Sequence, residues 1–194
     1  MTQRDAIAAF IAHLEHLRAG SDSHSKQAMA VLKRSLRLGP DRVPAVHRFV
    51  LPALPADARH WLIDTAYLIA GLFASHPLSS RAGNLGDHLA RLNALTSSAG
   101  LTRRFDILLT AQPDDLPRLL IPLLDLLRQA GIAVNWGQLF ADLLAYSFPD
   151  GQLRVRREWA TAFYTPRRAV AADLAPADPP LLVAEPALPS PEDE

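Results

Sequence analysis

The strongest constraint on the fold is the spacing of apolar residues, which recur every three or four positions along most of the chain. Leucine and alanine dominate this pattern, and the alternating runs of valine, isoleucine and threonine that are typical of strands are almost absent. Such spacing places apolar side chains on one side of a helix, so the sequence predicts an all-α protein. Helices are expected at about residues 7–17, 25–38, 44–51, 57–74, 85–95, 102–109, 116–127, 136–147 and 152–163.

Residues suited to helix ends accompany these segments. Thr2 and Asp5 resemble a capping box at the start of the first helix, and Gly20 is expected to end it. Proline suits a first helical turn but disturbs a helix interior, so Pro117 is expected to begin a helix and Pro122 to bend it. Three further N-caps are predicted at Thr102, at Asp114 or Asp115, and at Asn135.

The helices are expected to form two packed lobes, residues 1–95 and 96–165, followed by a tail at 166–194. Charge separates the tail from the lobes. All 20 basic residues and 14 of the 20 acidic residues lie at or before Arg168, so residues 1–168 carry a formal charge of +6 and residues 169–194 carry −6. The tail also holds six of the 16 prolines, and we predict that it is a disordered, proline-rich, acidic segment.

The expected helix at 25–38 has one cationic and one apolar side. Lys26, Lys33 and Arg37 fall within about 20° of one another around a helix axis, because seven and eleven residues are near-whole numbers of turns. Arg34 flanks them, and Asp22 and Asp41 lie beyond the ends of the helix. The opposite side carries Ala28, Val31, Leu32, Ser35 and Leu36. Two interpretations are open, a solvated helix face and a surface that binds phosphates.

Arginines form three further groups in the sequence. They are Arg81 and Arg91 around the loop Gly83–Gly86, the pair Arg103 and Arg104, and the group Arg154, Arg156 and Arg157. The last two groups are expected in the first turns of helices, where the helix dipole disfavours cations, and this placement favours contact with something anionic. Salt bridges to Asp106 or Glu158 are the alternative.

No catalytic or metal-binding constellation is recognisable. The chain has no cysteine, which excludes disulfides, a thiolate nucleophile and cysteine-ligated zinc. His13 and His16 have a spacing that suits a metal, but no third ligand is near in sequence, and surface histidines explain the pair. A helix cap explains Asp114 and Asp115 better than a catalytic dyad does. We therefore expect no enzyme activity, no metal and no cofactor.

Nothing in the sequence indicates a membrane protein. No stretch approaches the roughly 18 apolar residues of a membrane span, and the start of the chain lacks the features of a signal peptide. A cytoplasmic protein without membrane contact is expected.

The order of segments resembles the CasB family, the small subunit of the type I-E CRISPR surveillance complex, Cascade. The similar segments span roughly residues 5–165. They are Leu32–Gly39, Tyr67–Pro77, Asn84–Gly86, Arg104–Leu109, Asp115–Leu116, Val134–Leu139 with Asp142–Leu143, and Val155–Tyr164. No single segment is specific to the family, but the number, order and spacing of the segments together are specific to it. The tail departs from the shorter family pattern.

The resemblance implies a non-enzymatic, all-helical subunit whose partners are the other Cascade subunits, the crRNA and a second copy of itself. In that family, basic surface is presented to displaced single-stranded DNA and helps to hold the R-loop open. The resemblance carries a nucleic-acid contact to Lys33, Arg34, Arg103, Arg104, Arg154, Arg156 and Arg157, and the helix-face reasoning extends it to Lys26 and Arg37. Arg81 is a further candidate. The alternative is a helical protein-interaction adaptor without a nucleic-acid role.

Overall fold

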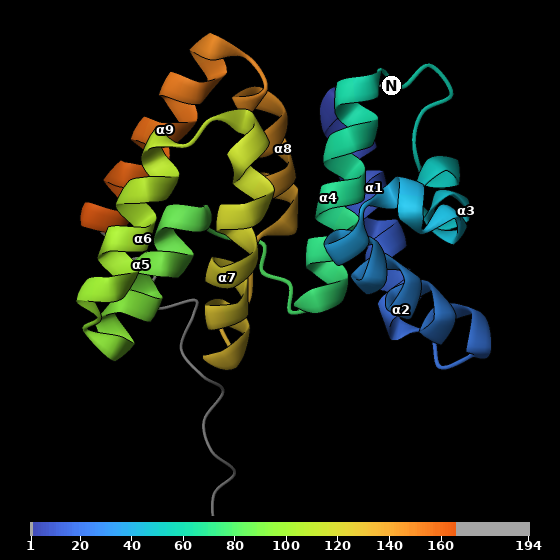
Figure 1. Ribbon diagram of the computed structural model, residues 1–194, viewed down its shortest axis with the longest axis horizontal. Helices are drawn as coiled ribbons and strands as arrows, with labels where there is room; N and C mark the ends of the chain where they lie inside the picture. The colour runs from blue at the N-terminus through green and yellow to red at the C-terminus, as the bar shows by residue number, and fades with distance from the viewer. Residues whose placement is uncertain (1, 166–194) are drawn as a thin grey trace, which may run out of the picture.

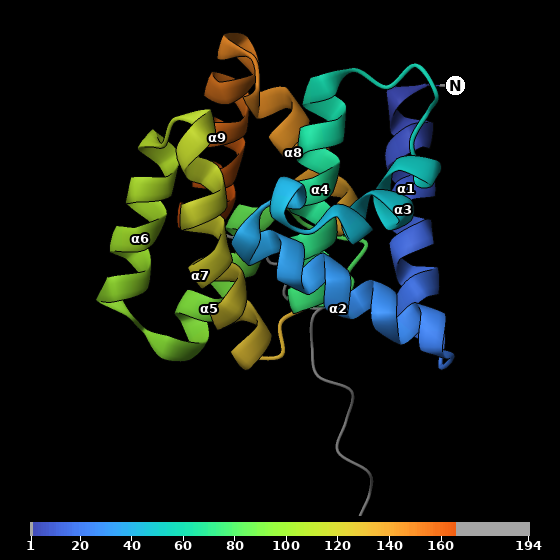
Figure 2. The ribbon, with the colours of Figure 1, turned by 45° about the vertical axis from the view of Figure 1, so that its right-hand side comes forward.

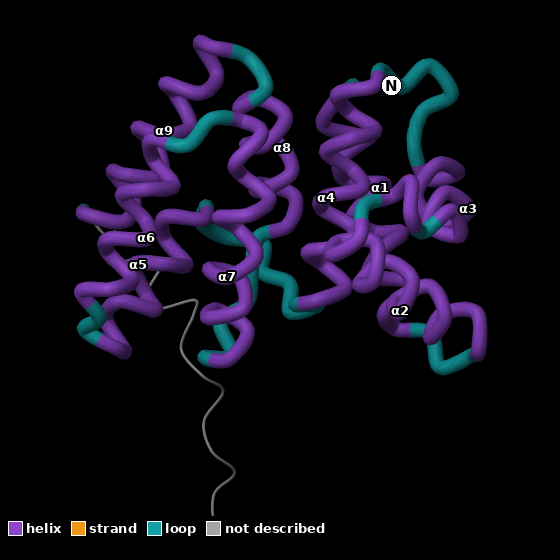
Figure 3. Tube along the Cα trace, in the orientation of Figure 1, coloured by secondary structure: helices purple, strands orange, loops and turns teal. Residues whose placement is uncertain are grey.

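The computed structural model describes residues 2–165, and over this range the fold is all-α (Figures 1 and 3). The helices are α1 (Gln3–Ala19), α2 (Ser23–Leu38), α3 (His47–Val50), α4 (His60–Ser75), α5 (Leu85–Thr96), α6 (Ala99–Thr110), α7 (Leu116–Gln129), α8 (Trp136–Tyr146) and α9 (Pro149–Tyr164). Within this range, the only β-type pairing is an isolated parallel bridge between Ser79 and Val134. The all-α prediction is confirmed, and the predicted tail lies outside the described residues.

Helix α4 is the centre of the N-terminal half. Helix α2 packs closely along it, and α1 and α3 complete the group on the right of Figure 1. The close approach of α2 depends on Gly71, because a Cβ atom at that position would lie 2.8 Å from Cβ of Leu36. The expected helix at 44–51 is a short α3 between two 3₁₀ turns, Pro44–Val46 and Leu51–Ala53. Pro44 and Pro52, which cannot donate a backbone hydrogen bond, fall in these turns.

The C-terminal half contains α6, α7, α8 and α9, and α5 joins it. Helix α5 packs chiefly on α9 and secondarily on α7, and both views place it beside these helices (Figures 1 and 2). Helix α5 therefore packs with the C-terminal helices, although it lies before the division expected between residues 95 and 96. Periodicity shows that a segment is helical but does not show which neighbours its apolar side will meet.

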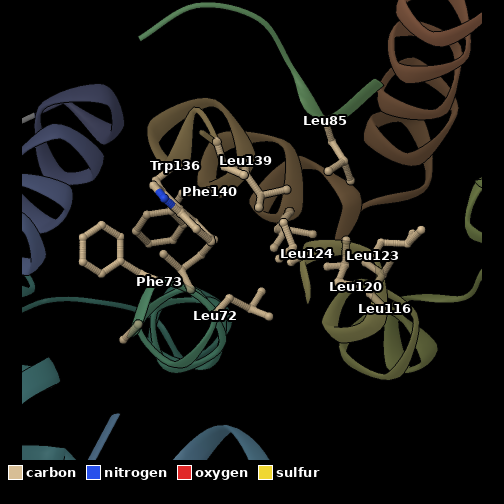
Figure 4. Close-up of a cluster of buried hydrophobic side chains, with 14 of the residues drawn as sticks. Leu72, Phe73, Leu85, Leu116, Leu120, Leu123, Leu124, Trp136, Leu139 and Phe140 are labelled. Carbon is tan, nitrogen blue, oxygen red and sulfur yellow. The ribbon is translucent and has the colours of Figure 1, made fainter. Parts of the chain in front are cut away.

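A single continuous core joins the two halves. Helix α8 contacts α1 and α4 on one side and α9 on the other. Phe10 of α1 meets Phe140 of α8 edge-on, with ring centroids 5.4 Å apart, and Phe73 of α4 meets Trp136 at 5.6 Å. Figure 4 shows Leu72 and Phe73 beside Trp136 and Phe140, with the leucines of α7 next to them.

The segments 76–84 and 130–135 run side by side, and hydrogen bonds between them connect the two halves. The N–H of Ser80 donates to the carbonyl oxygen of Val134 at 2.9 Å, and the N–H of Val134 donates to that of Leu78 at 3.0 Å. The indole N–H of Trp136 also donates to Leu78, at 3.2 Å. These bonds hold the connection between α4 and α5 against the chain that leads into α8.

Several predicted helix ends are confirmed. Thr2 and Asp5 form the capping box, the backbone N–H of Gly20 closes α1, and the Asn135 side chain caps α8. Pro117 lies in the first turn of α7, and Pro122 lies inside that helix.

Two predicted helix starts are wrong: helix α6 is capped by Ser98 rather than Thr102, and α9 begins at Pro149 rather than near Gln152. Asp115 is the N-cap residue of α7, as predicted, but its side chain makes no capping hydrogen bond. Ser98, like Thr102, has a hydroxyl that can accept from the helix, and the sequence pattern did not separate the two residues.

Candidate nucleic-acid interface

Helix α2 is capped at its N-terminus by Asp22, and both carboxylate oxygens of this residue accept hydrogen bonds. One oxygen of Asp22 accepts from the backbone N–H of Ser25 at 2.9 Å, and the other accepts from the Ser25 hydroxyl at 2.7 Å. The bonds from the Ser25 backbone and hydroxyl lower the pKa of Asp22 from 3.8 to about 2. Asp22 is thus an N-cap bound to its own helix, and its two oxygens do not pair with the lysines that follow.

The two sides of α2 differ as the sequence predicts. Ala28, Leu32 and Ser35 are buried against the rest of the N-terminal half, and Val31 and Leu36 are half-buried. The Ser35 hydroxyl donates to the carbonyl oxygen of Leu32 at 2.8 Å, so this polar group is satisfied inside the core.

The other side of α2 is what we name the cationic ridge, Lys26, Lys33, Arg34 and Arg37. All four side chains are exposed. Three ion pairs occur among residues 2–165, and all of them involve other arginines. No carboxylate in this range therefore lies within 4.0 Å of a charged nitrogen of the ridge. At 1.5 Å per residue the ridge extends over about 16 Å, a length over which one strand of B-form DNA carries about five phosphates.

The C-terminal end of the ridge borders a narrow cleft between the two halves. Lys33 and Arg37 line one side, and Asp125 and Arg128 of α7 line the other. The guanidinium group of Arg128 is bound to Asp125 at 3.1 Å. The helix-face reasoning did not include Arg128, since only the tertiary structure brings α7 beside α2.

Arg103 and Arg104 form a separate cationic site on α6. Both are exposed and have no carboxylate within 4.0 Å in the described part of the chain. Helix α7 lies between α6 and α4 (Figures 1 and 2), so this pair belongs to the other half of the molecule from the ridge. Because α6 begins at Ala99, the pair lies beyond the first turn, and the expectation that the helix dipole opposes these arginines is wrong.

Arg81 and Arg157 come together at one polar groove. Arg81 follows the connection from α4, Arg157 lies on α9, and the groove between them also contains Asp87 and Glu158. Both arginines are exposed and make no ion pair with a described residue. The loop Gly83–Gly86 beside them starts α5, where Asn84 and Asp87 form a capping box.

Arg154 and Arg156 make contacts within the protein. Arg154 donates to both oxygens of Glu158, each at 3.0 Å. Arg156 is half-buried, and its Nε donates to the hydroxyl of Tyr146 at 2.8 Å while its Nη2 donates to the carbonyl oxygen of Ala111. Since α9 begins at Pro149, these residues also lie beyond the first turn, so the dipole argument fails here too.

Sequence reasoning missed three buried titratable groups, His76, His88 and Asp142. Each connects elements distant in sequence. Nε2 of His76 lies 2.8 Å from the carbonyl oxygen of Ile132, and Nε2 of His88 accepts from the backbone N–H of Asn135. Asp142 accepts from the Trp159 indole at 2.7 Å, and burial raises its pKa despite this bond. No local pattern distinguishes such residues from exposed ones.

His13 and His16 do not form a metal site with other residues in the described range 2–165. Nε2 of His13 lies 2.9 Å from the carbonyl oxygen of Phe49, and His16 is exposed. Within residues 2–165, no group of three or more histidine, aspartate or glutamate side chains is arranged to hold a metal ion. None of the helices in this range is both long enough and apolar enough to cross a membrane.

Residues 2–165 thus form an all-helical body on which α2 presents four exposed cations, none of them paired with a carboxylate in that range. Residues 28–164 match the family model of the CRISPR-associated protein Cse2, and this chain belongs to that family. No curated protein matches the chain.

Solved structures agree with this assignment. A Cse2-family protein from Thermus thermophilus is 25% identical, with a TM-score of 0.71 over 84% of this chain and 99% of that one. CasB from M. ruber is 29% identical, with a TM-score of 0.65 over 87% and 96% of the two chains. A chain of a CRISPR RNA-guided surveillance complex is 25% identical, with a TM-score of 0.71 over 88% and 98%. The resemblance to the CasB family is confirmed.

Proposed function

We propose that this protein is a non-catalytic subunit of a CRISPR RNA-guided surveillance complex, where its partners are the other subunits, the crRNA and a second copy of itself. Its family and its similarity to a chain of such a complex support this role. Within the complex, the cationic ridge contacts the sugar–phosphate backbone of displaced single-stranded DNA and helps to keep the R-loop open.

The observation that carries the nucleic-acid role is the absence of carboxylate partners for the four ridge cations among the described residues. A cation already paired offers little to a phosphate, whereas an unpaired one can neutralise a phosphate and so release a counterion from the nucleic acid. Four further arginines are also exposed and have no carboxylate partner among the described residues, so they take the same role. They are Arg81, Arg103, Arg104 and Arg157. Arg154 and Arg156 contribute less, because their donors are held by Glu158, Tyr146 and Ala111.

Backbone contacts suffice for this function. In RNA-guided recognition, base pairing with the guide reads the sequence, and strand exchange is nearly balanced in free energy. A few phosphate contacts can therefore shift the balance toward the open R-loop without reading any base. The assembly supplies the avidity that a formal charge spread over two halves lacks.

The test is the salt dependence of R-loop stability in the assembled complex. Replacing Lys33→Glu and Arg34→Glu should weaken the R-loop and reduce the slope of log affinity against log salt by about 1.4, because each phosphate neutralised on a single strand accounts for about 0.7. Arg118→Glu is the matched control for each substitution, since it makes the same change in charge at an exposed arginine already paired with Asp115.

Wild-type R-loop stability in the double variant across the whole salt series would refute the nucleic-acid role. If the complex also co-purified normally with this subunit, the adaptor alternative would remain as the explanation. Circular dichroism of the variant subunit checks that the fold is intact.

A further inference from the structure

A second surface lies apart from the cationic ridge, at the junction of α1, α4 and the α8–α9 corner. It is a groove of about 1020 Å³ whose lining includes the apolar side chains of Ile7, Trp61 and Phe148. The rings of Trp61 and Phe148 meet edge-on with centroids 5.8 Å apart. Phe148 is 49% exposed although it is a large aromatic residue.

Three arginines also line this groove. Arg4 comes from α1, Arg81 from the connection between α4 and α5, and Arg154 from α9. No aspartate or glutamate lines the groove, and only Arg154 has a carboxylate partner in the described range, Glu158. Aromatic rings with arginines around them favour an occupant that is apolar in the middle and anionic at its flanks.

The chain itself contains a segment of this kind. Leu181, Leu182 and Val183 lie between Asp178 and Glu185, and Pro179, Pro180 and Pro186 surround them. Proline-rich segments recognise aromatic-lined grooves, because proline limits the conformational entropy that is lost on docking. The apolar part of the lining also suits a peptide better than a sugar–phosphate backbone.

We propose that residues 178–185 dock into this groove, with the apolar residues on Trp61 and Phe148 and the acidic residues beside Arg4, Arg81 and Arg154. This inference goes beyond the proposed function and does not depend on it. Where both hold, the tail and a nucleic acid compete for Arg81.

The segment that follows Thr165 is long enough to reach the groove, and Thr165 itself lies close to it. Thr165, the last described residue, lines the polar groove of Arg81 and Arg157. Arg81, Asn135 and Gln138 line both grooves, so the two are continuous. The 16 residues from Thr165 to Leu181 can extend over up to about 50 Å, which exceeds the distance between neighbouring grooves.

The experiment places a spin label on the full-length chain. Because the protein has no cysteine, Ala184→Cys creates a single attachment site for a nitroxide. We expect selective loss of NMR intensity at the Trp61 indole and at the amides of Ala8 and Ala145. The loss should disappear when the nitroxide is reduced.

Two matched pairs of charge reversals test specificity. Arg4→Glu with Arg154→Glu should restore the groove signals, whereas Lys26→Glu with Lys33→Glu should leave them attenuated. Leu181→Ser with Leu182→Ser should also restore them while leaving the charge unchanged.

Three outcomes would overturn the proposal. One is full intensity at the groove in the labelled wild-type background, and another is attenuation centred on α2 or α6 instead. The third is attenuation of ¹⁵N protein by spin-labelled ¹⁴N protein in a mixture, since this would identify a second copy as the occupant.

Discussion

At the scale of a single residue, burial changes the acid–base behaviour of His88. Its side chain is fully buried on α5, and Nε2 accepts from the backbone N–H of Asn135 at 3.1 Å. A neutral imidazole that accepts at Nε2 carries its proton on Nδ1, and this atom has no hydrogen-bond partner among the described residues. Burial, which disfavours the charged ring, is the main reason that the pKa of His88 falls from 6.5 to about 4.

We expect His88 to make the fold less stable in mild acid. Between pH 6.5 and about 4 the unfolded chain binds a proton at this residue and the folded protein does not, so stability falls as pH decreases through this range. The full loss is about 3 kcal/mol, and it adds no further pH dependence below pH 4. His88→Gln should remove this component from urea unfolding curves measured at several pH values.

The exposed His16→Gln variant is the control for the substitution itself. A His88→Gln variant that loses stability as steeply as the wild type between these pH values would contradict the assignment.

At the scale of an element, the close packing of α5 against α9 favours glycine at position 86. Helices α5 and α9 meet so tightly that a Cβ atom on Gly86 would lie 2.1 Å from the carbonyl oxygen of Trp159. The neighbouring atom belongs to the backbone of α9 and cannot rotate away. The absence of a side chain at Gly86 allows α5 to pack this closely on α9.

Gly86→Ala should therefore destabilise the protein, by about 1–3 kcal/mol as for other overpacked positions. Gly100→Ala is the matched control, since its added Cβ would meet only Oγ of Ser98, at 3.6 Å. Alanine favours a helix more than glycine does, so the control should be as stable as the wild type or more stable. Thermal unfolding of both variants decides the comparison, and equal destabilisation would count against the close approach.

At the scale of the whole molecule, the two halves share one core rather than meeting at a separate interface. The buried residues from α1 to α9 form a continuous cluster, and α8 carries aromatic contacts to both α1 and α4. The cationic sites, by contrast, are spread over both halves. Because the halves share one core, the spacing between these cationic sites is set by how the helices pack.

Sharing a core predicts a single unfolding transition. Helix loss measured by circular dichroism should coincide with the change in fluorescence of the tryptophans, which are in both halves. Phe140→Ala removes the ring that meets Phe10 and should cost about 3–5 kcal/mol while keeping the transition single. Ile107→Ala, at a residue 47% exposed on α6, should have a much smaller effect. Two resolved transitions in the wild type would show that the halves unfold independently.

Local pattern and local chemistry were sufficient for the helices and for the face of α2. Apolar spacing has the period of the helix itself, so each helical segment and the opposed sides of Lys33 and Leu32 could be read from neighbours in sequence. Side-chain caps such as Thr2 act within three residues, which made them predictable, although Ser98 and Thr102 offer the same hydroxyl and were confused.

The sequence by itself therefore determined that the chain is helical, which residues of α2 meet solvent, and how charge is divided between the body and the tail. The tertiary structure decided that α5 packs on α9, that His88 and Asp142 are buried, that Arg156 is engaged by Tyr146, and that Arg4, Arg81 and Arg154 surround one groove. The physical reason is the distance along the chain over which each effect acts. Helical periodicity and capping depend on residues within about one turn, whereas burial and the meeting of distant side chains depend on how whole helices pack.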